Sequence, residues 1–321
     1  MHNEGISSGN GFQLSCPEAY PNSAFCIHAQ QEVITIELKI VAAREGRLSS
    51  FLREELKMSS SLMNKLKWGD GIRVNGEAQR TNYPVRPGDV ITVRLDEEEP
   101  EYPAEDGPLT ILYEDDYLLA VDKPAGMLIH PSWSCFSGTL ANFVAGYYRR
   151  LGQKSAFHPM TRLDRDTYGI VLLAKSAHVH TLLQNTKVQK TYHALTLGGP
   201  EVDSGVIDAP IARRELPSLL RHISPEGKPS VTEYRVLERD GKLCKLELRP
   251  ITGRTHQLRL HCAHMGFPIL GDPQYGSEES LEISLGMGLR GQLLCAKRLE
   301  FVHPVTGQAM CLESRMDAEI M

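Results

Sequence analysis

The sequence predicts an α+β fold built on a mixed or antiparallel sheet. Short apolar or alternating segments recur along the C-terminal two thirds of the chain, and turn residues separate them, which is typical of strands. Helical periodicity is confined to brief stretches, notably 177–187 and a segment beginning near Thr255. Many strands with few short helices indicate an α+β domain. The expected strands cover 109–113, 117–121, 170–174, 190–197, 231–237 and 243–248.

The composition is that of an ordinary globular protein, with 41% hydrophobic and 23% charged residues among 321. No apolar run approaches the roughly 18 residues that span a bilayer, and the N-terminus lacks the features of a secretory signal. The seven cysteines are scattered without a Cys-x-x-Cys pair, which fits a reducing cytoplasm. We therefore expect a cytoplasmic protein without a membrane segment. Because the net charge is −5, any binding of nucleic acid requires a local basic face.

The N-terminal part divides into a tail and a small domain. Residues 1–34 are rich in Gly, Ser, Asn and Pro and are expected to be disordered. Residues 35–96 resemble the S4-type RNA-binding domain in the order of their elements, with an Asn75-Gly76 hairpin turn. Only Lys65 and Lys67 supply charge to the second helix, so an unrelated small α+β module is the alternative. The expected elements are helices at 48–56 and 59–66, a strand at 72–74 and a strand segment at 85–93.

An acidic segment separates this module from the larger C-terminal domain. Residues 97–107 contain many like charges, which repel one another, and two prolines, which stiffen the chain. We therefore expect a linker over 97–107 and a second domain over 108–321.

A charged loop stands directly before the most apolar strand, 170–174. Arg162, Asp164, Arg165 and Asp166 lie within five consecutive residues of that loop. One interpretation is a surface turn in which Asp166 and its neighbour Thr167 tie their side chains to backbone amides. The other is a carboxylate that the arginines keep ionised for chemistry, because a nearby opposite charge lowers the pKa of an acid. The loop alone leaves both open.

A second motif covers 252–268 and predicts a helix of about three turns beginning near Thr255. Leu258, Cys262 and Met265 share one stripe of that helix, and the following Gly-Phe-Pro segment ends it. Arg259 then projects from the first half of the helix beside the small Ala263.

Several classes of site find no support. His256 and His261 would point about 140° apart on a helix, and zinc sites need three or four ligands. No Gly-x-Ser-x-Gly elbow, phosphate-binding loop or dinucleotide fingerprint occurs. We expect no metal and no nucleotide cofactor. Tyr192, on the expected strand 190–197, is either a core aromatic or a platform for a planar base.

Four ordered segments resemble the motifs of the RluA-type pseudouridine synthases, in which an S4-like module is a common companion. A fifth closes the region of resemblance, which spans 109 to about 312. The five segments are DKPAGMLIHP at 122–131, RLDRDTYG at 162–169, KTYHALTLG at 190–198, the long motif at 248–276 and LEFVHPVTG at 299–307.

The resemblance implies roles for particular residues. Asp164 corresponds to the catalytic aspartate, Tyr192 to the base-stacking tyrosine and Arg259 to the arginine that pairs with the aspartate. Arg162 corresponds to the arginine that fills the gap left by an extruded uridine, and Leu258 is an expected substrate contact. Asp166 and Thr167 become supports of the loop. The chain departs from the family pattern at Thr161, at Tyr168 and in the segment 293–296, which leaves the subgroup, and hence the RNA site, undefined.

The implied reaction breaks the glycosidic bond of a uridine, turns the uracil and rejoins it through carbon five, without redox change. An ionised carboxylate can act as nucleophile or base, and attack on the ring and a route through the sugar both stay open. Extruding the uridine costs a few kcal/mol, and stacking on an aromatic ring returns about 1–3 kcal/mol. The candidate phosphate-binding residues are Arg149, Arg150, Lys154, Arg165, Lys187, Lys190, Arg213, Arg214, Arg221 and Lys228.

The expected partner is structured RNA, ribosomal or transfer RNA, bound by a monomer. A non-catalytic RNA-binding or ribosome-assembly protein with the same fold is the alternative, and a metal-dependent hydrolase is a more distant one.

Overall fold

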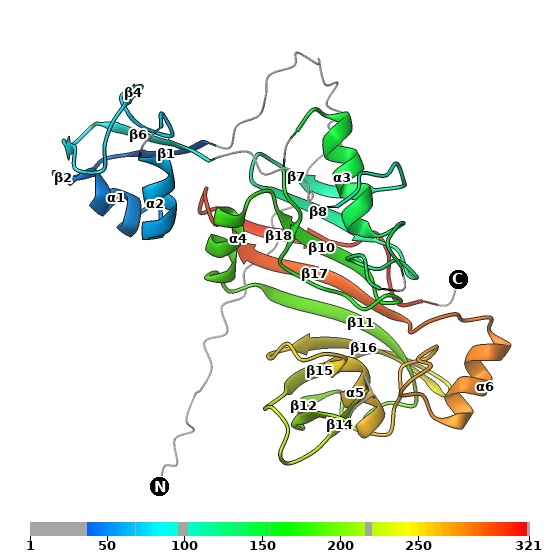
Figure 1. Cartoon of the computed structure of the whole chain (residues 1–321). Coiled ribbons are helices and arrows are strands. Elements are labelled where there is room, and N and C mark those ends of the chain that lie inside the picture. Colours follow the sequence, from blue (N-terminus) through cyan, green and yellow to red (C-terminus); the bar gives the residue numbers. More distant parts are fainter. Residues whose placement is uncertain are drawn as a thin grey trace, which may run out of the picture. The chain divides into compact units, whose positions relative to one another are not determined.

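The computed structural model of the chain describes residues 37–67, 69–95, 102–133, 135–153, 155–215 and 220–319 (Figure 1). The predicted disordered tail 1–34, the first half of the predicted linker and the candidate phosphate contact Lys154 lie outside the described residues.

The N-terminal module is a small α+β unit around its own hydrophobic core. Helical spacing buries Leu48, Phe51 and Leu52 on one face, and the Ser59 hydroxyl caps the second helix by accepting a hydrogen bond from the Leu62 amide. The main sheet has the order β1-β6-β3-β4, and β2 pairs with β5. The elements are β1 (Glu37–Val41), β2 (Gly46–Arg47), α1 (Leu48–Glu54), α2 (Ser60–Leu66), β3 (Ile72–Val74), β4 (Glu77–Ala78), β5 (Pro84–Val85) and β6 (Val90–Arg94).

The C-terminal part is built on one large sheet of order β12-β15-β16-β11-β17-β10-β8-β7, with β18 beside β17 and β9 beside β10. β10 and β17 are parallel, whereas the other pairings in this sheet are antiparallel. The predicted mixed or antiparallel sheet with few helices is therefore confirmed. The strands are β7 (Thr110–Glu114), β8 (Leu118–Lys123), β9 (His158–Pro159), β10 (Tyr168–Ala174), β11 (Gln189–Leu197), β12 (Ser204–Asp208), β15 (Val231–Asp240), β16 (Leu243–Pro250), β17 (Leu294–Val302) and β18 (Ala309–Glu313), and the hairpin β13 (Ile211–Arg213) and β14 (Arg221–Ile223) is separate.

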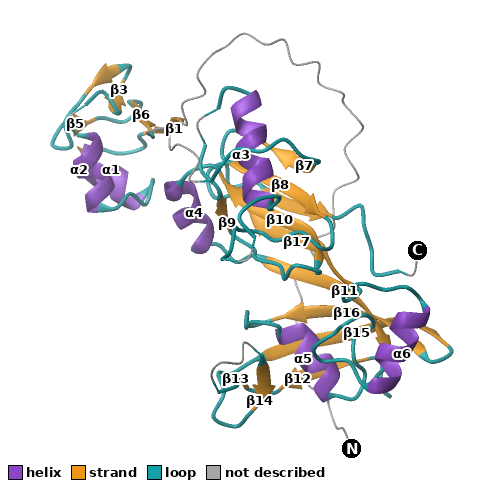
Figure 2. Cartoon of the chain, turned by 45° about the vertical axis from the view of Figure 1, so that its right-hand side comes forward, coloured by secondary structure: helices purple, strands orange, loops and turns teal. Residues whose placement is uncertain are grey.

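The helices that accompany this sheet are short, as Figure 2 shows. They are α3 (Leu140–Arg150), α4 (Ala177–Gln184), α5 (Gln257–His264) and α6 (Glu278–Gly286). Strand β10 is apolar throughout because both of its faces are covered: Val171 and Leu173 belong to the core cluster of α3, whereas Ile170 and Leu172 belong to that of α4. None of the helices described is long and apolar enough to cross a membrane.

Glycine at position 169 allows the parallel strands β10 and β17 to meet. Gly169 has φ +104°, and a Cβ there would collide with the backbone of Ala296, its partner in the parallel register. The register contains only two pairs, Tyr168 with Cys295 and Gly169 with Ala296. This short junction lies directly after the charged loop that carries Asp164.

Three expectations about helix ends are wrong. The helix predicted from near Thr255 begins at Gln257, because His256 adopts a left-handed conformation with φ 57° and interrupts it. Met265, predicted to share one helical stripe with Leu258 and Cys262, is instead the C-cap residue and is 45% exposed, whereas the other two are buried. The helix expected over 177–187 ends at Gln184, where Asn185 forms the C-cap.

The second half of the predicted linker lies along α3. Tyr102 packs against the apolar cluster beneath α3, and the Glu105 amide donates a hydrogen bond to the Asn142 carbonyl at 3.1 Å. Gly146 is required there, because a Cβ would overlap the Glu105 carbonyl.

Candidate active site

All five residues singled out from the sequence line one open cleft of about 690 Å³. Arg162 and Asp164 come from the loop before β10, Tyr192 from β11, and Leu258 and Arg259 from α5. The fold thus joins segments that are about 95 residues apart, as the spacing between Asp164 and Arg259 illustrates.

Asp164 presents one carboxylate oxygen to Arg259 and leaves the other open. The Arg259 Nη1 donates a hydrogen bond of 2.9 Å to Asp164 Oδ2, and the Asp164 side chain is 31% exposed. Among the described residues, none forms a hydrogen bond or ion pair with Oδ1. A half-exposed carboxylate with one oxygen neutralised and one free can act as nucleophile or base toward a molecule in the cleft.

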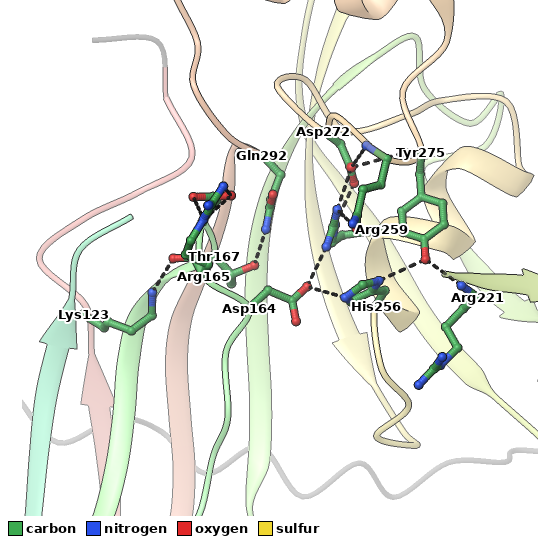
Figure 3. A network of polar contacts seen from close by, with 12 residues as sticks. Lys123, Asp164, Arg165, Thr167, Arg221, His256, Arg259, Asp272, Tyr275 and Gln292 are labelled. Atoms are coloured by element: carbon green, nitrogen blue, oxygen red, sulfur yellow. Dashed lines mark hydrogen bonds and ion pairs between the residues drawn. The ribbon is translucent and has the colours of Figure 1, made fainter. Parts of the chain in front are cut away.

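The loop that carries Asp164 is fixed from two sides (Figure 3). The buried Lys123 ammonium donates to the Arg165 carbonyl at 2.9 Å and to two further carbonyls of its own turn. Gln292 donates to the Thr167 hydroxyl at 3.0 Å, while Asp166 pairs with the Arg165 guanidinium. Burial lowers the pKa of Lys123 to about 8, against the opposing charges of Asp166 and Asp164. Lys123 therefore stays mostly protonated at neutral pH, as its three acceptors require.

Arg259 is held by a residue that the sequence did not single out. Asp272 accepts two hydrogen bonds of 2.7 Å from the Arg259 Nε and Nη2, and Gln274 accepts a third of 2.9 Å. Both ions are buried, with 5% and 1% of their side chains exposed. Burial alone would lower the pKa of Arg259, but the hydrogen bonds and charges of Asp272 and Asp164 raise it. The guanidinium is thus permanently charged and fixed in direction.

Asp272 could have been suspected from the sequence. It lies in the Gly-Asp-Pro turn of the long motif, and a carboxylate buried in the core almost always has a cationic partner. Its Oδ1 also accepts from the Gln274 and Tyr275 amides, so the same side chain shapes the turn.

Tyr192 and Leu258 form the apolar wall of the cleft. Tyr192 is half-buried and contacts the clusters beneath α3 and beneath α5, and Leu258 is buried in the latter. Burial first, and the charge of Asp164 second, raise the pKa of Tyr192, so that its ring stays neutral. Arg162 is exposed at the cleft and forms no ion pair with another described residue. Its charged side chain is therefore available to a molecule that enters the cleft.

His256, Tyr275 and Arg221 complete the polar network (Figure 3). Sequence reasoning missed His256 and Tyr275 as site residues and named Arg221 only as a candidate phosphate contact. The His256 Nε2 lies 3.7 Å from Asp164 Oδ2, and its Nδ1 lies 3.0 Å from the Tyr275 hydroxyl oxygen. The Arg221 amide donates to that oxygen at 3.1 Å. The expected angle between His256 and His261 assumed one continuous helix, which the left-handed His256 interrupts. The described residues contain no group of three or more His, Cys, Asp or Glu suited to a metal ion.

Comparison with known proteins identifies the class to which this fold and cleft belong. Residues 117–264 match the family model of RNA pseudouridylate synthase. YhcT of Bacillus subtilis, an uncharacterized RNA pseudouridine synthase, is 34% identical over 297 residues, which cover 89% of this chain and 95% of the relative. The chain therefore belongs to the RNA pseudouridine synthases. The resemblance stated from the motifs is confirmed, and so is the enzyme class, an isomerase that acts on RNA.

Two further relatives and one solved structure are similar to this chain. The ribosomal large subunit pseudouridine synthase C of Vibrio cholerae is 32% identical, with 85% of this chain and 90% of the relative covered. The ribosomal large subunit pseudouridine synthase D of Xanthomonas campestris is 36% identical, with 78% of each covered. The structure of human RNA pseudouridylate synthase domain containing 1 matches with a TM-score of 0.55 and 25% identity, over 67% of this chain and 86% of that chain.

Proposed function

We propose that this enzyme isomerises specific uridines of structured ribosomal RNA of the large subunit and that Asp164 is the reacting carboxylate. The observation that carries the proposal is the arrangement of Asp164, whose Oδ2 is held by the buried Arg259 while Oδ1 faces the cleft without a partner among the described residues. The names of the relatives from Vibrio cholerae and Xanthomonas campestris support ribosomal RNA as the substrate class.

The chemistry balances without any group from outside the chain. The bond between N1 and C1′ breaks, the uracil turns, a bond forms between C5 and C1′, and the proton of C5 is lost while N1 gains one. A carboxylate serves both the attack and the departure because it is a weak base that leaves cleanly. The fixed guanidinium of Arg259 donates to Asp164 Oδ2 at 2.9 Å and so places a positive charge beside the reacting carboxylate.

The cleft can also offset the cost of extruding the uridine. Stacking on the Tyr192 ring returns about 1–3 kcal/mol of the few kcal/mol lost from the RNA stack. Arg162 is placed to occupy the vacated space, and Arg165, Lys190 and Arg254 line the same cleft, where they can neutralise phosphates. This cluster supplies a local basic face on a chain whose net charge is −5. We further propose that the enzyme acts as a monomer in the cytoplasm.

The Asp164→Asn variant tests the role of the carboxylate. The amide cannot act as base or nucleophile, so we expect the rate of tritium release from RNA labelled at C5 of uridine to fall by about 10²–10⁴-fold, while RNA binding stays within a few-fold. The exposed Asp116 provides the matched control, Asp116→Asn. Full activity of the Asp164→Asn variant would remove Asp164 from the mechanism.

A second measurement tests the substrate class. In a strain that lacks this protein, pseudouridine should disappear from one or a few positions of large-subunit ribosomal RNA and reappear when the gene is restored. Loss from transfer RNA alone would contradict the ribosomal assignment, and no loss from any RNA would favour a protein that only binds RNA.

A further inference from the structure

His256 stands in a backbone conformation that its residue type rarely adopts. Its φ of 57° and ψ of 20° are left-handed, a region in which a side chain with a Cβ costs roughly 1–2 kcal/mol. It also occupies the N-cap position of α5 without capping the helix through its side chain. The His256 side chain therefore does not stabilise α5 as an N-cap.

The strained turn is held by Gln257, the first residue of the helix. The Gln257 side-chain oxygen accepts from the Thr252 hydroxyl at 2.8 Å and from the Arg254 amide at 3.0 Å, and its side-chain nitrogen donates to the Val231 carbonyl at 2.9 Å. These bonds fix the backbone on both sides of His256. The imidazole consequently points toward Asp164 rather than toward the helix amides (Figure 3).

A chain of hydrogen bonds selects the tautomer of His256. The Arg221 amide can only donate, so the Tyr275 oxygen accepts from it, and the Tyr275 proton is available for the His256 Nδ1. The remaining proton of a neutral imidazole then lies on Nε2, which faces Asp164 Oδ2 at 3.7 Å. The opposite tautomer would place the lone pair of Nε2 against a carboxylate oxygen, which is repulsive.

Burial favours the neutral form of the imidazole. Burial lowers the pKa of His256, Asp164 and Asp272 act in the opposite direction, and Arg259 and Arg221 lower it further. Asp164 lies on the loop before β10, and Arg259 lies on α5. Asp272 lies in the turn 270–276, and Arg221 lies on β14. A neutral donor can orient Asp164 without forming a second ion pair, which would cancel the charge that the reaction uses.

We propose that His256 is a positioning residue, which turns Asp164 so that Oδ1 faces the uridine while Oδ2 remains with Arg259. This inference rests on the proposed role of Asp164 and extends it. The 3.7 Å separation is longer than a hydrogen bond, and such contacts often tighten only when substrate is bound.

His256→Gly is the sharpest test, because glycine adopts the left-handed conformation without strain and should fold at least as well as histidine. We expect kcat to fall by about 10- to 100-fold, since misplacing a reacting group by about 1 Å has this effect, with KM for RNA within about two-fold. His256→Gln, which can restore a side-chain N–H, should recover part of the lost kcat. The matched control is His264→Gln on the exposed end of α5.

The pH dependence of kcat/KM distinguishes a positioning role of His256 from a purely structural one. In the wild type, protonation of His256 strengthens its pairing with Asp164, so kcat/KM should decline on the acid side, and this decline should be absent from His256→Gln. Wild-type kcat in His256→Gly, or an acid limb unchanged in His256→Gln, would overturn the inference. If Asp164→Asn is inactive while His256→Gly is fully active, only the positioning role fails; if Asp164→Asn is active, the proposed mechanism itself fails.

Discussion

At the scale of single residues, Tyr192 shows how burial and function share one side chain. Its ring packs against two apolar clusters and also forms part of the cleft wall. Its hydroxyl forms no hydrogen bond with another residue in the part of the chain that the structure describes. The ring face, rather than the hydroxyl, is therefore the feature that a flipped base can use.

This arrangement predicts unequal effects of two substitutions at position 192. Tyr192→Phe keeps the stacking face and should retain activity within roughly ten-fold. Tyr192→Ala removes the ring, and the loss of about 1–3 kcal/mol of stacking should raise KM or lower kcat by about 5- to 150-fold. Steady-state kinetics with one RNA fragment would measure both. Equal losses would mean that the hydroxyl participates in the reaction.

The residues that sequence reasoning found and those that it missed differ in kind. Asp164, Tyr192 and Arg259 lie in motifs that are continuous in the chain, so resemblance could point to them. Asp272 and His256 lie in the same long motif as Arg259, but their importance comes from side-chain contacts with Arg259 and Asp164 that only the folded geometry reveals. His256 was considered only as a metal ligand, because its left-handed backbone could not be foreseen.

At the scale of elements, apolar runs predicted the strands well, because a strand covered on both faces has a nearly continuous apolar sequence. The helix α3 was not predicted, although Thr139 and Asn142 form a reciprocal cap at its start. Its glycine, which admits the Glu105 carbonyl, weakens the helical signal that the sequence carries. The ends of helices were predicted less well than the strands, because the backbone geometry at a helix end depends on tertiary contacts. The left-handed backbone of His256 is an example.

The contact between Lys123, the last residue of β8, and the loop that carries Asp164 leads to a prediction at the scale of elements. Lys123→Met fills a similar volume but leaves three carbonyls without their buried donor. We expect the free energy of unfolding to fall by about 2–4 kcal/mol and kcat to fall as well, because the loop loses its anchor at the Arg165 carbonyl. Chemical denaturation would measure the former. The exposed Lys187→Met is the control, and unchanged stability of Lys123→Met would show that the three bonds contribute little.

At the scale of the whole molecule, the N-terminal module has a separate apolar core and exposes cations such as Arg47, Arg53 and Lys57. Its resemblance to an S4-type domain stays a prediction. The strand order of the large sheet could not have been read from the sequence, because pairing between distant strands leaves no local trace. The class of the fold could, since it depends on the number and length of the elements.

The module leads to a prediction about substrate size. If it binds RNA outside the cleft, a chain that lacks residues 1–95 should show a KM about ten-fold higher for a long structured ribosomal fragment, which corresponds to about 1.4 kcal/mol of binding. The kcat should stay within about two-fold, and a short hairpin substrate should be unaffected. Equal KM values for full-length and shortened chains on the long fragment would assign the module another role.

The parallel pairing between β10 and β17 comprises only two register pairs, although side chains of both strands share one apolar core cluster. Asp164 lies on the loop before β10, whereas Arg259 lies on α5, which packs with β16 on the other side of this pairing. Their ion pair therefore connects the two sides of the sheet. Any change in the spacing of those two sides would also change the distance between the guanidinium and the carboxylate.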